Sequence, residues 1–348
     1  MRAPLPFRTP VPRAVATIEL REYEEGDEAE ILETFNRVFA GVDPNFEPRG
    51  IDHWRWQYLG NPSGSKVLVA WTPEGKVAGQ LGNVWQRVWL QGRLVSFSQA
   101  VDSMSDPALR KGLKKESLQA RLGNLYAETW AGEGEGKQAL LWGAPVPAAW
   151  RVGKNFIRYE VIRTQLLLFA PPDAVIPGDP GGVEVEEAER FPLEVADLFE
   201  RCRDEHGAIA VRDAPQLDWR FTDHPVHDYS VAFARRSGRI AGYAVYRVGD
   251  FDGRAGVGLL CDWLVPAEDH AARAALLAWL RNRGRADGVA ELVAVLPDTS
   301  SEWDTFQNAG FRAAPTQYAI VGRECVPGLD MRFLRENWYY TLGDTDLV

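Results

Sequence analysis

The sequence has few cysteines and no long apolar run. Its three cysteines (Cys202, Cys261 and Cys325) are odd in number and lack metal-ligand spacing, so neither a disulfide framework nor a structural metal centre is predicted. Disulfides belong to oxidising compartments, and their expected absence favours the cytosol. No stretch approaches the roughly 18 apolar residues of a membrane-spanning helix. Residues 1–16 also lack the apolar core of a signal peptide.

Positive charge is in short supply. The chain has 39 Lys and Arg against 49 Asp and Glu, a formal net charge of −10. This balance argues against a nucleic-acid partner bound over a broad face, because phosphate contacts need clustered cations. A hydrophobic content of 45% with 25% charged residues is typical of a folded globular protein. The length of 348 residues suits two domains of roughly 150 residues each.

The chain contains two related segments. Trp56 begins the pattern W-x-Y-x-x-N-P, and Trp219 begins W-x-F-x-x-H-P, an offset of 163 residues. At the same offset, GKVAG (75–79) aligns with GRIAG (238–242) without a gap. A repeat of this length indicates a duplicated domain and not a solenoid, whose units span roughly 20–50 residues.

A segment rich in proline and glycine marks the boundary between the copies. Residues 169–182 read FAPPDAVIPGDPGG, with four prolines and three glycines, a composition that does not suit the interior of a helix or strand. We therefore predict an N-terminal domain over 17–168 and a C-terminal domain over 183–322, joined by this linker. A flexible segment (1–16) precedes them and a tail (323–348) follows.

The predicted elements run in the same order in each copy. An opening strand leads to a helix (27–40 in the first copy) and a short aromatic helix (51–59). Strands joined by hairpin turns follow, then a long amphipathic helix (113–131), a strand, a short helix and terminal strands. The corresponding helices of the second copy are predicted at 191–206, 213–222 and 269–284. The fold class is therefore α/β, with each copy a mixed, mostly antiparallel sheet flanked by helices.

This arrangement resembles the GNAT N-acetyltransferase superfamily, and its tandem members most of all. The segments WRWQYLGNP (54–62), VDSMSDPALR (101–110) and AWRVGKNFIRYEV (149–161) have counterparts there, and the chain also ends in a similar way. The likeness covers residues 17–322 and the tail. It implies two tandem GNAT-like domains, acetyl-CoA or another acyl-CoA as co-substrate, no metal, and a primary amine on a small molecule or saccharide as acceptor.

In this superfamily the CoA diphosphate lies at the N-terminus of the helix after the fourth strand, where main-chain N–H groups and the helix dipole favour an anion. The family pattern R/Q-x-x-G-x-G/A falls on DPALRKGLKKES (106–117). Arg110 matches the first position, but Leu113 and Lys115 stand at the two glycine positions. If Gly112 takes the first glycine position, Leu109 stands at the Arg/Gln position and Lys114 at the second glycine position, so this register does not match either.

The loop therefore departs from the family pattern, although its four cations can hold phosphates by charge. The alternative is a solvated, basic start of a helix. On the first interpretation, the predicted cofactor-binding residues are Ser103, Met104, Arg110, Lys111, Gly112, Leu113, Lys114 and Lys115. The equivalent loop of the second copy, PAEDHAAR (266–273), has no glycine and carries Glu268 and Asp269, which would repel a diphosphate. We therefore expect activity in the N-terminal copy, with the C-terminal copy degenerate.

The resemblance also suggests the catalytic groups. A carboxylate on the fourth or fifth strand often takes the proton of the amine, and Asp102, at the end of SQAVDSM, is the best positional match. Asp262 is its counterpart, and a match in both copies also suits a purely structural carboxylate. A tyrosine acid is expected near the short helix after the fifth strand, where Tyr159 is the nearest candidate. The histidines of TDHPVHDY (222–229) suit a polar turn better than a metal site.

The leading hypothesis is an acyl-CoA-dependent N-acyltransferase that acts on a primary amine, for example an amino sugar. A second hypothesis is aminoacyl transfer from a charged tRNA, as in Fem-type tandem relatives. A third is a non-catalytic scaffold that kept the fold. The groove between the copies is the expected acceptor cleft, with residues 338–340 of the tail along it. The oligomeric state is open.

Overall fold

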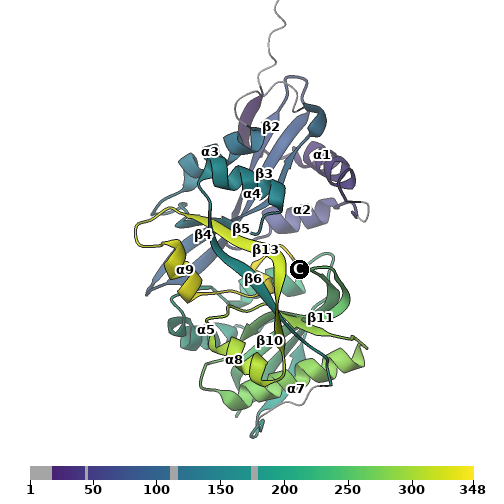
Figure 1. Ribbon diagram of the computed structural model, residues 1–348, viewed down its shortest axis with the longest axis vertical. Coiled ribbons are helices and arrows are strands. Elements are labelled where there is room, and N and C mark those ends of the chain that lie inside the picture. Colours follow the sequence, from purple (N-terminus) through teal and green to yellow (C-terminus); the bar gives the residue numbers. More distant parts are fainter. Residues whose placement is uncertain (1–17, 44–45, 110–116, 174–178) are drawn as a thin grey trace, which may run out of the picture.

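The computed structural model describes residues 18–43, 46–109, 117–173 and 179–348. Two α/β units lie along the long axis of the molecule (Figure 1). A single sheet runs through both, in the strand order β1-β2-β3-β4-β5-β13-β6-β12-β11-β10-β9-β7; β8 also pairs with β3, and β14 pairs with β8. Neighbouring strands are mostly antiparallel, as the sequence predicted.

The first copy contains β1 (Glu19–Glu22), α1 (Glu28–Ala40), α2 (Ile51–Tyr58), β2 (Ser65–Trp71), β3 (Val77–Leu90), β4 (Arg93–Ser105), η1 (Pro107–Leu109), α3 (Leu118–Trp130), β5 (Leu140–Gly143), α4 (Pro147–Val152), the π-helical turn η2 (Gly153–Ile157) and β6 (Glu160–Ala170). The second contains β7 (Glu184–Ala188), α5 (Val195–Cys202), η3 (Arg203–Glu205), β8 (Ala208–Ala210), α6 (Ala214–Leu217), η4 (Asp218–Thr222), β9 (Ser230–Arg236), β10 (Arg239–Phe251), β11 (Arg254–Leu264), α7 (His270–Ala286), β12 (Leu292–Ala294), α8 (Ser301–Asn308) and β13 (Arg312–Glu324). The tail forms α9 (Met331–Asn337), β14 (Trp338–Tyr339) and η5 (Leu342–Asp344).

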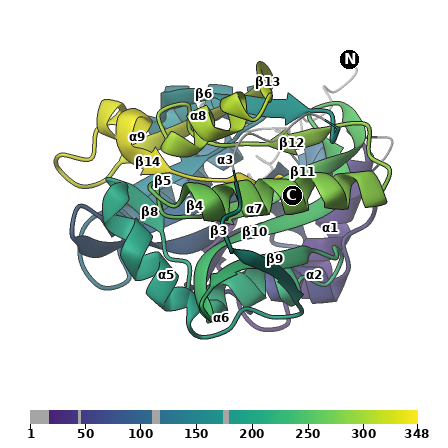
Figure 2. The same ribbon diagram turned by 90° about the horizontal axis from the view of Figure 1, so that it is seen from below.

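The helices form where their sequences are amphipathic and capped. In α1, Ile31, Leu32 and Phe35 are buried on one face, the spacing that a helix against a sheet requires. The Ser117 hydroxyl accepts a hydrogen bond from Ala120 N at 3.1 Å and starts α3. The Asp269 carboxylate does the same for Ala272 N at 3.0 Å and starts α7, which lies across β9 and β10 (Figure 2).

The two copies exchange their last strands. β13, the final strand of the second copy, pairs with β5 and β6 of the first copy. β6, the final strand of the first copy, pairs in turn with β12 of the second. Both strands therefore cross the middle of the molecule between the two units (Figure 1). Each copy completes its sheet with a strand from the other.

The repeated tryptophans meet at the contact between the copies. The Trp56 indole N–H donates to the main-chain oxygen of Trp219 at 2.6 Å, and the Trp219 indole returns the bond to Trp56 at 2.8 Å. Their rings stack with centroids 5.1 Å apart and planes 17° apart. Because each residue makes the same contact as its counterpart, the motif that revealed the repeat also forms a local two-fold contact between the copies.

Candidate active site between the two copies

A cavity of about 240 Å³ lies where the copies meet. Side chains of α2, β3 and β4 line one side, η4 and β10 line the other, and residues 343–348 of the tail close it. The sequence predicted an acceptor cleft here, but its expected lining by residues 338–340 is wrong. Trp338 is buried instead, edge-on against Trp142 with ring centroids 5.0 Å apart.

Asp102 lines this cavity and is fixed through one of its two oxygens. The guanidinium of Arg49 donates to Oδ2, and so do the Tyr58 hydroxyl at 2.6 Å and Gln57 Nε2 at 3.1 Å. All three donors come from α2 or the residues just before it. Among the described residues no hydrogen bond to Oδ1 is found, so this oxygen is the one that a bound molecule can reach.

The backbone around Asp102 is irregular in a way that serves this contact. Asp102 has a φ of +51°, and the pairing of β4 with β3 shifts register opposite it, between Gln80 and Gly82. Such bulges re-aim a side chain, and Asp tolerates this left-handed conformation better than most residues. A Cβ on Gly82 would collide with the Tyr58 hydroxyl. The glycine therefore lets Tyr58 reach the carboxylate.

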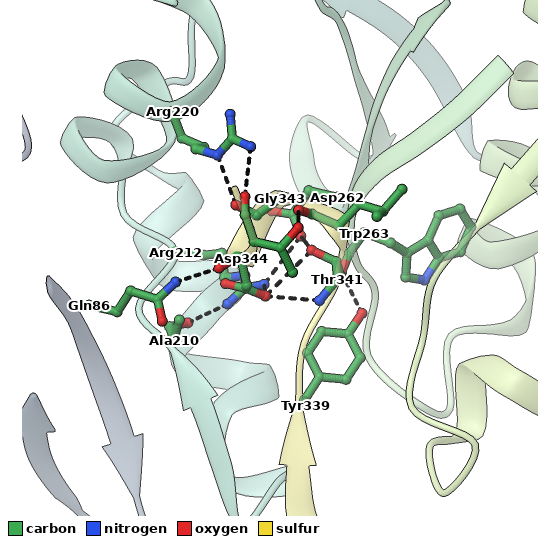
Figure 3. A network of polar contacts seen from close by, with 12 residues as sticks. Gln86, Ala210, Arg212, Arg220, Asp262, Trp263, Tyr339, Thr341, Gly343 and Asp344 are labelled. Carbon is green, nitrogen blue, oxygen red and sulfur yellow. Dashed lines mark hydrogen bonds and ion pairs between the residues drawn. The ribbon is translucent and has the colours of Figure 1, made fainter. Parts of the chain in front are cut away.

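The second copy repeats the arginine–aspartate pair in a covered form. Arg212 Nη2 lies 3.3 Å from Asp262 Oδ1, and both residues are 2% exposed. Thr341 and Asp344 of the tail cover them: the Thr341 hydroxyl donates to Asp262 at 2.9 Å, and Arg212 donates to Asp344 at 2.5 Å (Figure 3). Burial raises the pKa of Asp344.

The two pairs therefore differ in what covers them. The Arg49 and Asp102 side chains keep 18% and 10% of their surface exposed, against 3% for each member of the second pair. The tail also fills the space beside β11, since a Cβ on Gly343 would lie 2.9 Å from the main-chain oxygen of Cys261. Of the two pairs, the first is the more accessible to a small molecule.

In the first copy, β4 also extends past the end of β5 beside this pair. β4 pairs with β5 in parallel as far as Gln99 opposite Trp142, yet β4 continues to Ser105 while β5 ends at Gly143. At this point Gln99 Nε2 donates to Asp346 Oδ1 of the tail at 2.7 Å. Asp346 itself is exposed, but loss of hydration among the surrounding protein atoms raises its pKa to about 6, and the charge of Asp102 adds to the rise.

Three histidines line another part of the wall. His53 of the first copy faces His224 of the second with ring centroids 5.6 Å apart, and His227 stacks on His224 at 4.8 Å. Burial, with the positive charge of Arg220 adding to it, lowers the pKa of His224 to about 2. Burial also lowers the pKa of His53 and of His227 to about 4. All three rings are therefore neutral at pH 7.

The predicted cofactor residues fall partly outside the described part of the chain. Residues 110–115 lie in the undescribed range 110–116, so the predicted phosphate loop stays a prediction. Ser103 is exposed near the end of β4. Met104 is 2% exposed and packs into the core, while its main-chain oxygen accepts a hydrogen bond from Gln119 Nε2.

Tyr159, the predicted acid, does not line the cavity. It lies after η2 and packs on Gly153, where a Cβ would lie 3.2 Å from the tyrosine ring. Burial raises its pKa, so the hydroxyl keeps its proton at pH 7. The structure does not bring Tyr159 together with Asp102, and its catalytic role stays a prediction.

Sequence reasoning missed Arg49 and Asp346. A signal for the first was present, because Arg49 and Arg212 each stand seven residues before a repeated tryptophan. No pattern marks Asp346, which reaches the site only through the path of the tail. Within the described residues, no cluster of three His, Cys, Asp or Glu side chains suits a metal ion. No helix there is long and apolar enough to cross a membrane.

Comparisons with known proteins find similarity in structure alone. No family model and no curated protein sequence matches the chain. A GCN5-related N-acetyltransferase from Anabaena variabilis superposes with a TM-score of 0.61 at 13% identity, over 89% of this chain and 73% of that one. A tandem GNAT protein from the clavulanic acid biosynthesis pathway gives 0.55 at 14%, over 90% and 100%. N-myristoyltransferase of Saccharomyces cerevisiae, with bound myristoyl-CoA, gives 0.55 at 12%, over 92% and 83%.

The strand order of each copy, the duplication and these superpositions agree. The chain has the fold of the GCN5-related N-acetyltransferases, in the tandem form that its sequence predicted.

Proposed function

We propose that the protein is an acyl-CoA-dependent N-acyltransferase that acts through its N-terminal copy. The observation that carries this proposal is that β4 continues past the end of β5 directly beside Asp102 and the cavity. The second copy has the same arginine–aspartate pair, but the tail covers it. A role for acyl-CoA, most simply acetyl-CoA, is supported by the fold and by the myristoyl-CoA bound to the yeast neighbour.

The described residues fit the donor in part. Beyond Gln99, β4 has no strand partner on the β5 side in the described part of the chain, and Ser103 is exposed there. An extended acyl-pantetheine arm suits such an open strand edge. The diphosphate would be held by residues 110–115, as the sequence predicts. Acyl-CoA supplies the activated thioester, and the protein supplies binding, orientation and proton transfer.

Two carboxylates divide the work on the acceptor. Asp102, ion-paired with Arg49 through Oδ2, presents Oδ1 to the ammonium group of the acceptor and orients it. Asp346, with a pKa of about 6, takes a proton from that ammonium near neutral pH. The free amine forms a bond to the thioester carbon and the carbon–sulfur bond breaks. The leaving thiolate takes one proton from an acid, and the second proton of the amine nitrogen replaces it on that acid. Tyr159 stays our candidate for the acid that supplies a proton to the sulfur.

The cavity limits the size of the acceptor. At about 240 Å³ it is smaller than the roughly 300–1,000 Å³ of pockets for drug-sized ligands, which favours an amine the size of an amino acid or a monosaccharide over an oligosaccharide or peptide. An amino sugar fits this range. We place the reaction in the cytosol, because all three cysteines are free thiols.

The test separates donor binding from chemistry. We expect acetyl-CoA to bind the wild type with micromolar affinity by calorimetry, and Arg110→Glu/Lys111→Glu to abolish that binding. Asp102→Asn should bind acetyl-CoA normally but lose turnover. Arg332→Glu/Arg335→Glu changes the net charge by the same amount on the exposed face of α9 and should behave like the wild type.

A well-folded wild type that binds no acetyl-CoA or CoA at millimolar concentration would remove this proposal. Aminoacyl transfer and a scaffold role would then be the remaining hypotheses.

A further inference from the structure

Some of the arginines that line the cavity are paired with a carboxylate and others are not. Arg49 and Arg212 each pair with an aspartate, and Arg87 pairs with Asp213. Two other lining arginines have no carboxylate within ion-pair distance among the described side chains. Arg220 donates to the main-chain oxygens of Gly343, Thr345 and Val348. Arg247 donates to Val248 O at 3.2 Å, and its buried Nε has no partner.

The neighbouring histidines add donors without adding charge. His224 Nδ1 accepts from the main-chain N–H of Val226 at 3.2 Å and of His227 at 3.1 Å. Its proton must therefore be on Nε2, because a neutral imidazole has one donor and one acceptor. Arg247 and His227 line the same cavity, and after burial the charge of Arg247 also lowers the pKa of His227. The end of the cavity near Arg247 therefore has more hydrogen-bond donors than acceptors.

The other end of the cavity carries carboxylates. Asp102 and Asp346 both line the cavity there, beside the point where β5 ends, and Gln99 of β4 donates to Asp346. His53 lies between the two ends: it is one helical turn before Gln57, which donates to Asp102, and its ring faces His224 with centroids 5.6 Å apart. The cavity is therefore negative at the proposed amine site and positive at Arg247. Such a wall complements a molecule that carries an ammonium at one end and an anion at the other.

We propose that the acceptor is a zwitterionic amine whose carboxylate or phosphate is bound by Arg247 with His224 and His227. This inference rests on the proposed function, and it narrows the acceptor from any small amine to one with an acidic group. The Arg247 guanidinium is partly exposed, but its buried Nε has no hydrogen-bond partner among the described residues, and an anion of the ligand would supply the missing acceptor. Arg247 and His227 also line a second hollow.

The first test measures anion binding without turnover. The imidazole C–H signals of the wild type are followed by NMR while inorganic phosphate or acetate is added. We expect saturable shifts of the His224 and His227 signals, assigned with His224→Asn and His227→Asn, and a rise in both pKa values because an anion favours the protonated ring. His206, which stacks on Tyr339 away from the cavity, should not move.

Variants of Arg247 link the effect to its charge. Arg247→Gln should weaken anion binding about tenfold or more, and Arg247→Lys should retain most of it. Arg239→Gln, on the same strand but exposed and outside the cavity, is the matched control and should bind like the wild type. The larger effect of phosphate or of acetate identifies which anion the subsite prefers.

The second test compares acceptors that differ only in the acid group. With acetyl-CoA present, β-alanine is compared with propylamine, and phosphoethanolamine with ethanolamine. We expect the acidic member of at least one pair to be favoured about tenfold or more in kcat/KM, and Arg247→Gln to remove that preference. Absence of anion-induced shifts at His224 and His227 in the wild type would overturn the inference. Anion binding without acyl transfer to any amine would instead overturn the proposed function and leave the subsite standing.

Discussion

Asp102 shows how neighbouring groups fix one side chain for a task. Three donors converge on Oδ2, and the positive φ of the residue directs its side chain away from the regular strand path. The cost of this backbone conformation is met by the ion pair with Arg49. The remaining oxygen, Oδ1, keeps a defined direction toward the cavity. A carboxylate held in this way can orient an ammonium group with little loss of side-chain freedom.

Replacing Asp102 by Asn tests this role. We expect turnover to fall by about 10²-fold or more, because the amide cannot offset the charge of Arg49 or bind an ammonium equally well. Asn also tolerates the left-handed backbone, so the fold should survive at a cost of roughly 1–3 kcal/mol. Asp262→Asn is the matched control. Asp262→Asn should lower the unfolding temperature more than Asp102→Asn does, because the Asp262 pair is buried, yet it should leave kcat unchanged in the folded protein. Loss of turnover in both variants would contradict the proposal that only the first copy is active.

Asp346 gives a prediction that needs no substrate. In the folded protein its pKa is about 6, above the ordinary value of 3.8. The folded state therefore binds the proton more tightly than the unfolded state. The contribution of this group to the free energy of unfolding is largest below about pH 4 and is lost as the pH rises through about 6. Urea unfolding of the wild type and of Asp346→Asn from pH 4 to 7 should show this difference. A constant difference would mean that folding does not raise the pKa of this carboxyl.

The absence of a side chain at Gly82 of β3 allows Tyr58 to reach Asp102. Gly82 provides the gap into which Tyr58 reaches, so Gly82→Ala should displace the ring and remove its hydrogen bond to Asp102. We expect the unfolding free energy to fall by roughly 1–3 kcal/mol and activity to fall with it. In a Tyr58→Leu background the same Gly82→Ala change should cost clearly less, since the colliding ring is gone. Equal costs in both backgrounds, measured by chemical denaturation, would contradict this contact.

Individual elements were predictable where local patterns determine them. The predicted helices at 27–40 and 51–59 match α1 and α2 closely, because amphipathic spacing decides both. The helix predicted at 191–206 is shorter in the structure, where α5 covers Val195–Cys202. The short strand β8 was missed, since three residues carry no periodic signal. Its partners, β3 and β14, come from distant parts of the chain.

The site was predictable only to the extent that the repeat revealed it. Asp102 was found because it ends an apolar strand, and Trp56 and Trp219 because they recur at a fixed offset. The ion pair of Asp102 with Arg49 joins residues 53 positions apart, and its proximity to Asp346 depends on the folded path of the tail. Such contacts are set by tertiary packing. No local sequence pattern encodes them.

At the scale of the whole molecule, the strand exchange makes the copies interdependent. The edge of β5 is paired by β13 from Val321 opposite Gly143 to Glu324 opposite Leu140. On its other side β13 pairs with β6, which is itself paired by β12. Separating the copies would expose several strand edges at once, each a row of unpaired main-chain groups. The candidate active site shares this dependence, because both copies and the tail line its cavity.

This interdependence predicts a single unfolding transition for the full chain. We expect calorimetry to give equal calorimetric and van't Hoff enthalpies, as a two-state unit requires. Residues 18–170 produced alone should fail to unfold cooperatively, because β5 and β6 would lack β13 and β12. Adding residues 312–324 through a flexible linker should restore part of the cooperativity by returning the partner of β5. Two separate transitions in the full chain, or a stably folded 18–170 segment, would show that the strand exchange does not couple the folding of the two copies. The difference between their two arginine–aspartate pairs would then have to arise from the tail alone.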